Sequence, residues 1–341
     1  LASASTITWL IHQKFELSIP LYRQEKEWEA LGLRLSRATM SNWLLVVYRD
    51  WLVHIVHRLK LELLKQRYLH IDETHVQVLK EPGRKNTSDS YMWVYCSIRD
   101  AVNPIRYFEY QPGRSGKYPE AFLREYEGYI HTDAYSGYNA VSGVKRCLCY
   151  THLRRAFVDA LPKDIHNSEA SKPAEAILRL NQFFNIESEL EALPPDQKKK
   201  ERLIREKPLL EAFWSWAEKS AIGELPKSKL SKAFHYALNN REGFWNYLED
   251  GNCSISNSLA ENCIRPFVIG RKNWLFSGSP KGAEASAGIY TLVETAKANG
   301  LAPMKYIKYI LSDMPGSAFL EHPEYLDDYL PWNPLVKEFC R

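Results

Sequence analysis

Three strand-like runs separated by short polar turns constrain the fold most. The runs are Tyr68–Leu79, Tyr91–Ile98 and Ile105–Tyr110, and they are rich in β-branched and aromatic residues. Glu81–Ser88 and Asp100–Asn103 form the turns. Connections this short join antiparallel neighbours, because parallel strands need a crossover of about a dozen residues or more. The segment therefore predicts an antiparallel three-stranded meander.

Two further strands alternate with helices after the meander. Tyr118–Tyr126 has helical character, Tyr129–Asp133 is a fourth strand that ends at a Ser-Gly turn, and Val144–Cys149 is a fifth. A helix is expected over His152–Leu161. The order predicts an α/β fold, a mixed five-stranded sheet flanked by helices.

Helical segments precede the sheet. Residues 1–66 form a predicted N-terminal helical region, in which Leu21–Gly32 has apolar residues at helical spacing. Ser36 can cap a second helix that begins at Arg37. A helix, a Gly-containing turn and a helix together have the outline of a DNA-binding helix-turn-helix. Two packed helices with no role in DNA binding fit the same pattern.

A long helical insertion is predicted to interrupt the sheet-bearing core. We expect residues 67–161 to form the first part of the core, 162–250 the all-α insertion, 251–312 the second part and 313–341 a C-terminal tail. The basic run Lys198–Arg202 predicts a solvent-exposed helix face. A later helix opens near Asn257–Glu261, and Pro266 is expected to end or kink it.

Composition excludes several classes of protein. Hydrophobic residues make up 45% and charged residues 25% of the 341, as in ordinary globular proteins. No window approaches the roughly 20 apolar residues of a membrane helix, and Leu1–Ser5 lack the features of a secretory signal. Six scattered cysteines without a Cys-x-x-Cys pair argue against a disulfide framework and favour a cytoplasmic location. The net charge of +4 permits nucleic-acid binding without requiring it.

Three carboxylates stand out as candidates for chemistry. Asp72 lies inside the first strand, on the same face as His70, where an unpartnered carboxylate would be costly. Asp133 ends the fourth strand, a common place for sites in α/β sheets, although capping a turn would also explain it. Glu261 opens a helix, but Ser258–Glu261 also matches a capping box.

Carboxylates from two strands and one helix suit Mg²⁺ or Mn²⁺, which prefer carboxylate and water ligands. Two such ions, about 3.5–4 Å apart, would stabilise the attacking and leaving oxygens of an in-line phosphoryl transfer. The expected site is therefore a pair of divalent ions held by the three acids.

Several motifs together resemble the insertion-sequence-66 family of bacterial DDE transposases. The resemblance rests on Asp72–Thr74, Asp133–Tyr138, Cys149–Phe157, Asn257–Ser279 and Leu330–Pro334, with weaker support from Tyr22–Glu25 and Leu35–Thr39. It covers nearly the whole chain, and the segment around Glu261 is the most specific. Ala134 departs from the glycine expected there. The N-terminal coiled-coil and zinc-binding part of the family's longer members is not found in this sequence.

The resemblance implies an RNase H-like core interrupted by a helical insertion. It implies that Asp72 bridges two Mg²⁺ or Mn²⁺ ions while Asp133 and Glu261 each hold one. The implied activity is metal-dependent cleavage of DNA at transposon ends, followed by attack of the 3′-hydroxyl on target DNA. The implied partners are both DNAs, further copies of the chain in a homo-oligomer, and accessory proteins of the same element, with no membrane involved.

Basic and sulfur-bearing residues are secondary candidates. Cys149 and His152 have Cys-x-x-His spacing, but zinc would need two more ligands, so packing or support of the site is favoured. Arg154 and Arg155 could reach DNA phosphates, although neighbours on a helix diverge by about 100°. Better phosphate candidates are Arg265, Arg271 and Lys272, for which a solvated basic patch is the alternative. Trp274 could stack on a base, but core packing is favoured.

Two competing functions remain open from the residues alone. His70-Ile-Asp72 and His131-Thr-Asp133 repeat a His-x-Asp pattern that could hold the dinuclear centre of a metal-dependent hydrolase or nuclease. A DNA-binding protein with an inactive catalytic core is the other possibility, and the presence of all three carboxylates argues against it.

Overall fold

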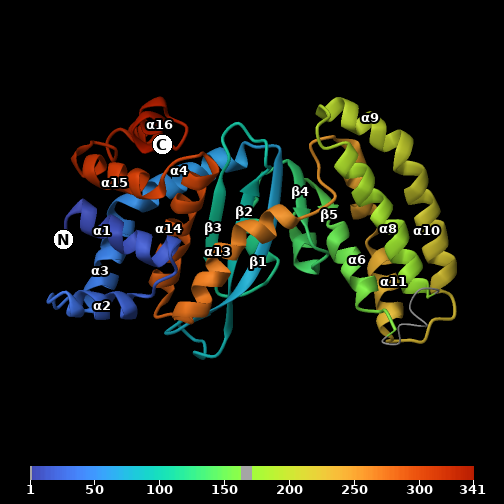
Figure 1. Ribbon diagram of the computed structural model, residues 1–341, viewed down its shortest axis with the longest axis horizontal. Helices are drawn as coiled ribbons and strands as arrows, with labels where there is room; N and C mark the ends of the chain where they lie inside the picture. Colours follow the sequence, from blue (N-terminus) through green and yellow to red (C-terminus); the bar gives the residue numbers. More distant parts are fainter. Residues whose placement is uncertain (1, 163–170) are drawn as a thin grey trace. The chain divides into compact units, whose positions relative to one another are not determined.

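A computed structural model describes residues 2–162 and 171–341, and the part of the predicted insertion at 163–170 lies outside the described residues (Figure 1). The chain divides into two compact units. The first comprises Leu1–Leu123 and Leu259–Arg341, and the second comprises Arg124–Ser258. None of the described helices combines the length and the apolar character that crossing a membrane requires.

The predicted meander forms the sheet of the first unit. Strands β1 (Tyr68–Val78), β2 (Asp89–Ser97) and β3 (Arg106–Gln111) are antiparallel neighbours, and Asp72 lies opposite Val94. A short strand that the sequence did not predict, β6 (Phe276–Ser277), pairs in parallel with the end of β1. Two residues are too few to display the alternation by which strands are recognised.

Helices cover both faces of this sheet. On the face of Ile71 and Tyr95, α5 (Lys117–Phe122) stacks the ring of Phe122 on Tyr95 with centroids 3.6 Å apart. On the opposite face, which carries Asp72, α13 (Ser258–Trp274) is tied to β1 because Arg271 donates to Thr74 Oγ1 at 3.1 Å. Figure 1 shows α13 running across β1 and β2.

Strand β3 ends this sheet on one side, and α14 (Pro280–Ala298) satisfies its outward backbone groups. Thr295 Oγ1 accepts from the Arg106 N–H at 3.1 Å, and Thr291 Oγ1 accepts from the Phe108 N–H at 2.8 Å. The edge is therefore closed to pairing with another strand. Gly288 of α14 touches the Tyr48 ring so closely that a Cβ would lie 2.1 Å from it.

The remaining elements of the first unit are helical, and α3, α4, α15, η1 and η2 among them contact α14. Ser36 caps α3 as predicted, because its Oγ accepts from the Thr39 N–H at 3.1 Å. These elements are α1 (Ala4–Ile11), η1 (His12–Glu16), α2 (Leu21–Ala30), α3 (Arg37–Val47), η2 (Tyr48–Leu52), α4 (Val53–Leu64), α15 (Pro303–Asp313), η5 (Met314–Gly316), η6 (Pro323–Tyr329) and α16 (Pro334–Cys340).

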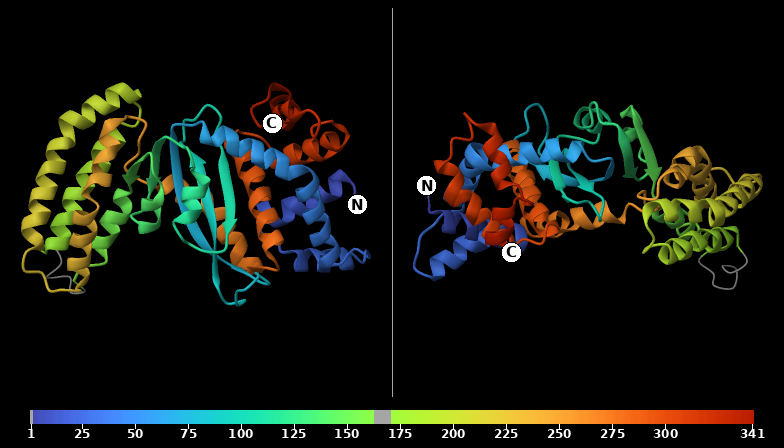
Figure 2. Two further views of the ribbon diagram at one scale, coloured as in Figure 1. Left: turned by 180° about the vertical axis from the view of Figure 1, so that it is seen from behind. Right: turned by 90° about the horizontal axis from the view of Figure 1, so that it is seen from above.

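The second unit contains two parallel strands and a helical bundle. Strands β4 (Gly128–Thr132) and β5 (Val144–Leu148) are joined through the short η3 (Ser136–Ala140). Figure 2 shows the long helices of the bundle side by side. The helical elements are α6 (Tyr150–Val158), α8 (Lys172–Glu189), α9 (Pro195–Arg205), α10 (Lys207–Ala221), α11 (Lys229–Asn239), α12 (Arg241–Trp245) and η4 (Asn246–Glu249).

The predicted fold class is confirmed, since the chain is α/β with parallel and antiparallel strands flanked by helices. All five predicted strands are present, and β6 makes a sixth. Within the described part of the predicted insertion, 171–250, every regular element is helical, as expected.

The prediction of a solvated face over Lys198–Arg202 is wrong for Arg202, which is fully buried. Its guanidinium pairs with both carboxylate oxygens of Glu187 at 2.6 and 2.7 Å, and it donates to the carbonyl oxygens of Tyr247, Asp250 and Cys253. Beside it, burial and the charge of Glu187 raise the pKa of Glu206 to about 7. A charge run in the sequence cannot reveal that one member points inward to a partner on another helix.

Replacing Arg202 with alanine should destabilise the second unit by about 3–5 kcal/mol, because Glu187 and three carbonyl groups would lose a buried donor. The matched control is Arg205→Ala on the same helix, whose exposed pair with Glu189 should contribute less than about 1 kcal/mol. Urea denaturation of the full chain followed by circular dichroism measures both. Equal loss of stability in the two variants would contradict this assignment.

Candidate active site

Asp72 is half-buried in the middle of β1, on the face that α13 covers. Its Oδ1 accepts from the Glu73 N–H at 2.9 Å, which restricts the carboxylate. The next side chain, Glu73, points to the opposite face and pairs with Arg114 at 2.5 Å. Two adjacent acids therefore have different environments, and only Asp72 faces the helix that carries Glu261.

Two thiols lie on the same face of the sheet as Asp72. Cys96 of β2 is opposite His70. The Cys96 thiol makes a hydrogen bond with the thiol of Cys263 on α13. Burial raises the pKa of the Cys96 thiol well above its usual value, and the neighbouring Cys263 and the charge of Asp72 raise it further. Since Cys263 lies two residues after Glu261, this contact brings the start of α13 to the Asp72 face.

Glu261 lies in the first turn of α13. A capping box with Ser258 would need the Ser258 N–H, but that group donates to Ser256 Oγ at 3.1 Å. The reciprocal bond of a Ser258–Glu261 capping box is therefore replaced by the contact with Ser256. Pro266 does not end the helix, which continues to Trp274, so of the two alternatives expected there, an end or a kink, the end is excluded. Proline removes only one donor from a helix that is anchored further on by Arg271.

Asp133 directly follows β4, and its carboxylate is fixed by a turn. Oδ1 of Asp133 accepts from the Tyr135 N–H at 2.9 Å. This is the contact that the turn-capping interpretation of Asp133 expects. Gly137 allows the turn to close, because a Cβ there would lie 2.2 Å from the Tyr135 ring. Asp133 is half-buried, which leaves part of its surface accessible.

Arg146 of β5 holds the whole loop that contains Asp133. Its guanidinium donates to the carbonyl oxygens of Asp133 and Tyr135 at 2.6 and 2.8 Å, and to Thr132 Oγ1 at 2.7 Å. A further bond reaches Asn139 Oδ1 at 2.6 Å. The arginine thus fixes the backbone on both sides of the carboxylate, a role that the sequence analysis missed.

Tyr236 connects the helical bundle to the same loop. Burial, and then the negative charge of Asp133, raise the pKa of its hydroxyl far above the usual value. The hydroxyl therefore stays protonated at neutral pH and lies close to Asp133. Tyr236 was not predicted, because its distance from Asp133 in sequence gives no signal of contact.

Cys149 and His152 form a pair just after β5. The Cys149 thiol is buried, which raises its pKa, but hydrogen bonds from His152 and from the Asn257 N–H outweigh burial and lower it overall. The Asn257 N–H lies 3.2 Å from Cys149 Sγ. The pair therefore fastens the segment that leads into α13, as a supporting role requires.

The predicted DNA-contacting residues fall into two groups. Arg155, Arg265 and Lys272 are exposed and can meet a phosphate. Arg154 instead donates to Asn181 Oδ1 at 2.7 Å, and Arg271 is bonded to β1, so both are engaged within the protein. Trp274 packs edge-to-face on Phe267 with centroids 5.4 Å apart, as its core interpretation predicts.

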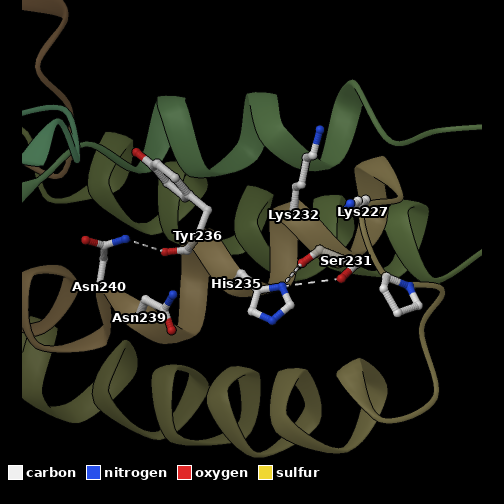
Figure 3. Close-up of a pocket in the computed structure, with 8 residues that line it drawn as sticks. Lys227, Ser231, Lys232, His235, Tyr236, Asn239 and Asn240 are labelled. Atoms are coloured by element: carbon white, nitrogen blue, oxygen red, sulfur yellow. Dashed lines mark hydrogen bonds between the residues drawn. The ribbon is translucent and has the colours of Figure 1, made fainter.

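A groove of about 480 Å³, lined in part by lysine, serine, histidine and asparagine side chains, lies along α11 in the second unit. Figure 3 shows its lining, with Lys232 and Tyr236 on α11 and Lys227 in the turn just before the helix. His235 is fixed by its Nδ1, which donates to the Ser231 carbonyl oxygen at 2.7 Å. Neither lysine makes an ion pair with a carboxylate of the described residues.

The fold is that of an α/β protein with a helical insertion. The sequence model of the transposase IS66 family matches residues 1–285, so the chain belongs to that family. The match spans Asp72, Asp133 and Glu261.

Similar curated proteins come from Sinorhizobium fredii. The chain is 26% identical to uncharacterized protein y4hP over 95% of its own length, and 27% identical to uncharacterized protein y4qI over 96%. It spans 60% and 62% of those two proteins. No solved structure matches.

Replacing Arg146 with alanine should loosen the loop that carries Asp133, because four hydrogen bonds are lost. We expect faster amide hydrogen exchange over residues 133–140 in Arg146→Ala, measured by mass spectrometry. Lys145→Ala is the matched control, since that exposed side chain faces Glu249 instead. Unchanged exchange in Arg146→Ala would show that the arginine does not hold the loop.

Proposed function

We propose that this chain is a DNA transposase that uses Asp72, Asp133 and Glu261 to cut DNA at the ends of an insertion sequence and to join those ends to target DNA. The family match over residues 1–285 carries the proposal, because it includes all three carboxylates. Membership supports transposase function in general. The DDE mechanism and the RNase H-like description of the core are our proposals.

The donor set fits divalent Mg²⁺ or Mn²⁺. All three side chains offer hard carboxylate oxygens, and these ions prefer oxygen ligands to sulfur. The Asp72 and Asp133 carboxylates are each oriented by a backbone N–H at 2.9 Å, as ligands of a preformed site should be. Asp72, Asp133 and Glu261 would be the residues that hold these ions. When bound, the pair of ions would activate the attacking oxygen and neutralise charge on the transferring phosphate.

The protein's own contribution is positioning. Arg146 and the Tyr135 N–H hold the Asp133 carboxylate, and Arg271 anchors the helix that carries Glu261 to the strand that carries Asp72. Rigid placement of this kind lowers the barrier to in-line transfer, because little ordering is left for the reaction step.

A hydrolase that uses the two His-x-Asp pairs is less well supported. His131 is buried, and its Nε2 accepts from the Ser254 N–H at 2.9 Å inside the second unit. His70 is also buried, and its strand neighbour across the sheet is Cys96. Neither histidine is an exposed partner for the aspartate two residues on.

DNA would be bound through exposed basic side chains. On α13 these are Arg265 and Lys272, on α6 Arg155, and along the α11 groove Lys227 and Lys232. Lysine and arginine that neutralise phosphates release counterions, which makes binding sensitive to salt. We propose that homo-oligomers of the chain bind transposon ends and target DNA in this way, with accessory proteins of the same element as further partners.

Removing any one carboxylate should abolish cleavage while leaving DNA binding intact. We expect Mg²⁺-dependent nicking of DNA that carries the element's ends to fall by more than about 100-fold in each of Asp72→Asn, Asp133→Asn and Glu261→Gln. Loss of a residue that only orients a metal ligand already lowers metal affinity or activity by about 10–100-fold. Glu120→Gln, at an exposed acid on α5, is the matched control and should nick as wild type does. Wild-type nicking by Glu261→Gln would refute the site.

Neutralising the α11 groove should weaken DNA binding at every sequence tested. For Lys227→Ala/Lys232→Ala we expect the slope of log affinity against log salt to fall in magnitude by about 2, because each phosphate contact contributes about 0.9. Lys200→Ala/Lys219→Ala removes the same charge from exposed positions on α9 and α10. Fluorescence anisotropy at several salt concentrations measures the slope. Equal slopes for the two double variants would show that the groove does not bind DNA.

A further inference from the structure

Three buried metal-ligand atoms gather in the second unit, apart from the three carboxylates. They belong to His131 of β4, Cys147 of β5 and Cys253 of the segment after η4, and they all lie within 4.8 Å of one another. Each of these residues exposes only 1% of its surface. We propose that they form a binding site for Zn²⁺ that fastens the two strands to the segment leading into α13.

The strands themselves bring two of the ligands together. His131 and Cys147 are direct partners in the parallel pairing of β4 and β5, so their side chains lie side by side on one face. This juxtaposition follows from the backbone register and does not depend on a flexible loop.

The third ligand is held in place from both sides. The Cys253 N–H donates to the Asp250 carbonyl oxygen at 3.1 Å, and the Cys253 carbonyl oxygen accepts from the buried Arg202 at 2.8 Å. The position of Cys253 over the two strands is therefore fixed before any ion binds, which limits the entropy cost of binding.

The chemistry of the trio suits zinc and excludes the ions of the carboxylate site. Two thiolates and an imidazole are soft or intermediate ligands that Mg²⁺ does not accept. Two thiolates also cancel the charge of Zn²⁺, so the complex is neutral and can be buried at low cost. In a tetrahedral zinc site the ligand atoms lie roughly 3.3–3.8 Å apart, so shifts of about 1 Å close the site. The trio supplies three of the four ligands of such a site.

Several hydrogen bonds must change when the ion binds. The Cys253 thiol is hydrogen-bonded to Cys147 and His131, and the Ser254 N–H donates to His131 Nε2 at 2.9 Å. Zinc bound at Nε2 would displace the Ser254 N–H. The released N–H belongs to the residue directly after Cys253, beside the new thiolate. The proposal does not rest on the transposase function, because zinc would bind whether or not the chain cuts DNA.

The test is the metal content of the full chain, produced without a polyhistidine tag and measured by inductively coupled plasma mass spectrometry. We expect about one zinc ion per chain in the wild type and almost none in Cys147→Ser and Cys253→Ser. Cys340→Ser, at a buried thiol of the first unit, and Cys149→Ser, at the nearby Cys-x-x-His pair, are the controls and should keep their zinc. Circular dichroism verifies that each variant is folded.

Cobalt substitution of the wild type gives an independent readout if a variant fails to fold. Co²⁺ bound by two thiolates in a tetrahedral site shows strong thiolate-to-metal charge-transfer absorption together with visible bands. Stoichiometric appearance of both, and their loss when Zn²⁺ is added, would support the site. Absence of zinc and of these bands, zinc that persists in both cysteine variants, or a Cys147–Cys253 disulfide in reduced preparations would overturn it.

Discussion

The pairing of β1 with β2 from Leu69 to Gln77 is the constraint on which the candidate site depends most. Because side chains alternate along a strand, this register decides that Asp72 faces α13 while Glu73 turns to Arg114 on the other face. A slip of one residue would exchange the two acids and bury the wrong one beside the helix. The bond from Arg271 to Thr74 then fixes α13 against the same face.

In the second unit the Asp133 carboxylate is positioned by a turn and its hydrogen bonds, and not by strand register. Asp133 stands in a turn after β4, where Arg146 binds the backbone on both sides and Tyr236 brings a protonated hydroxyl from the helical bundle. Deeper in the same unit, Arg202 holds the segment from Tyr247 to Cys253. Buried polar contacts, rather than helix propensity, thus shape the surroundings of the site.

Much of the fold could be predicted from the sequence, because it depends on local patterns. The five strands and the Ser36 cap depend on local patterns, and the antiparallel order follows from the short turns. Arg202, Arg146 and Tyr236 could not be found in this way, because their roles depend on partners far away along the chain. The sequence could not decide whether Pro266 ends the helix of Glu261 or only kinks it, and the structure shows that α13 continues to Trp274.

The central claim is that carboxylates from three distant parts of the chain share divalent ions. Anomalous diffraction from crystals of the full chain soaked in Mn²⁺ tests it most directly. The account predicts manganese peaks bounded by carboxylate oxygens of Asp72, Asp133 and Glu261. Manganese bound only elsewhere, with these three side chains apart from any ion, would contradict it.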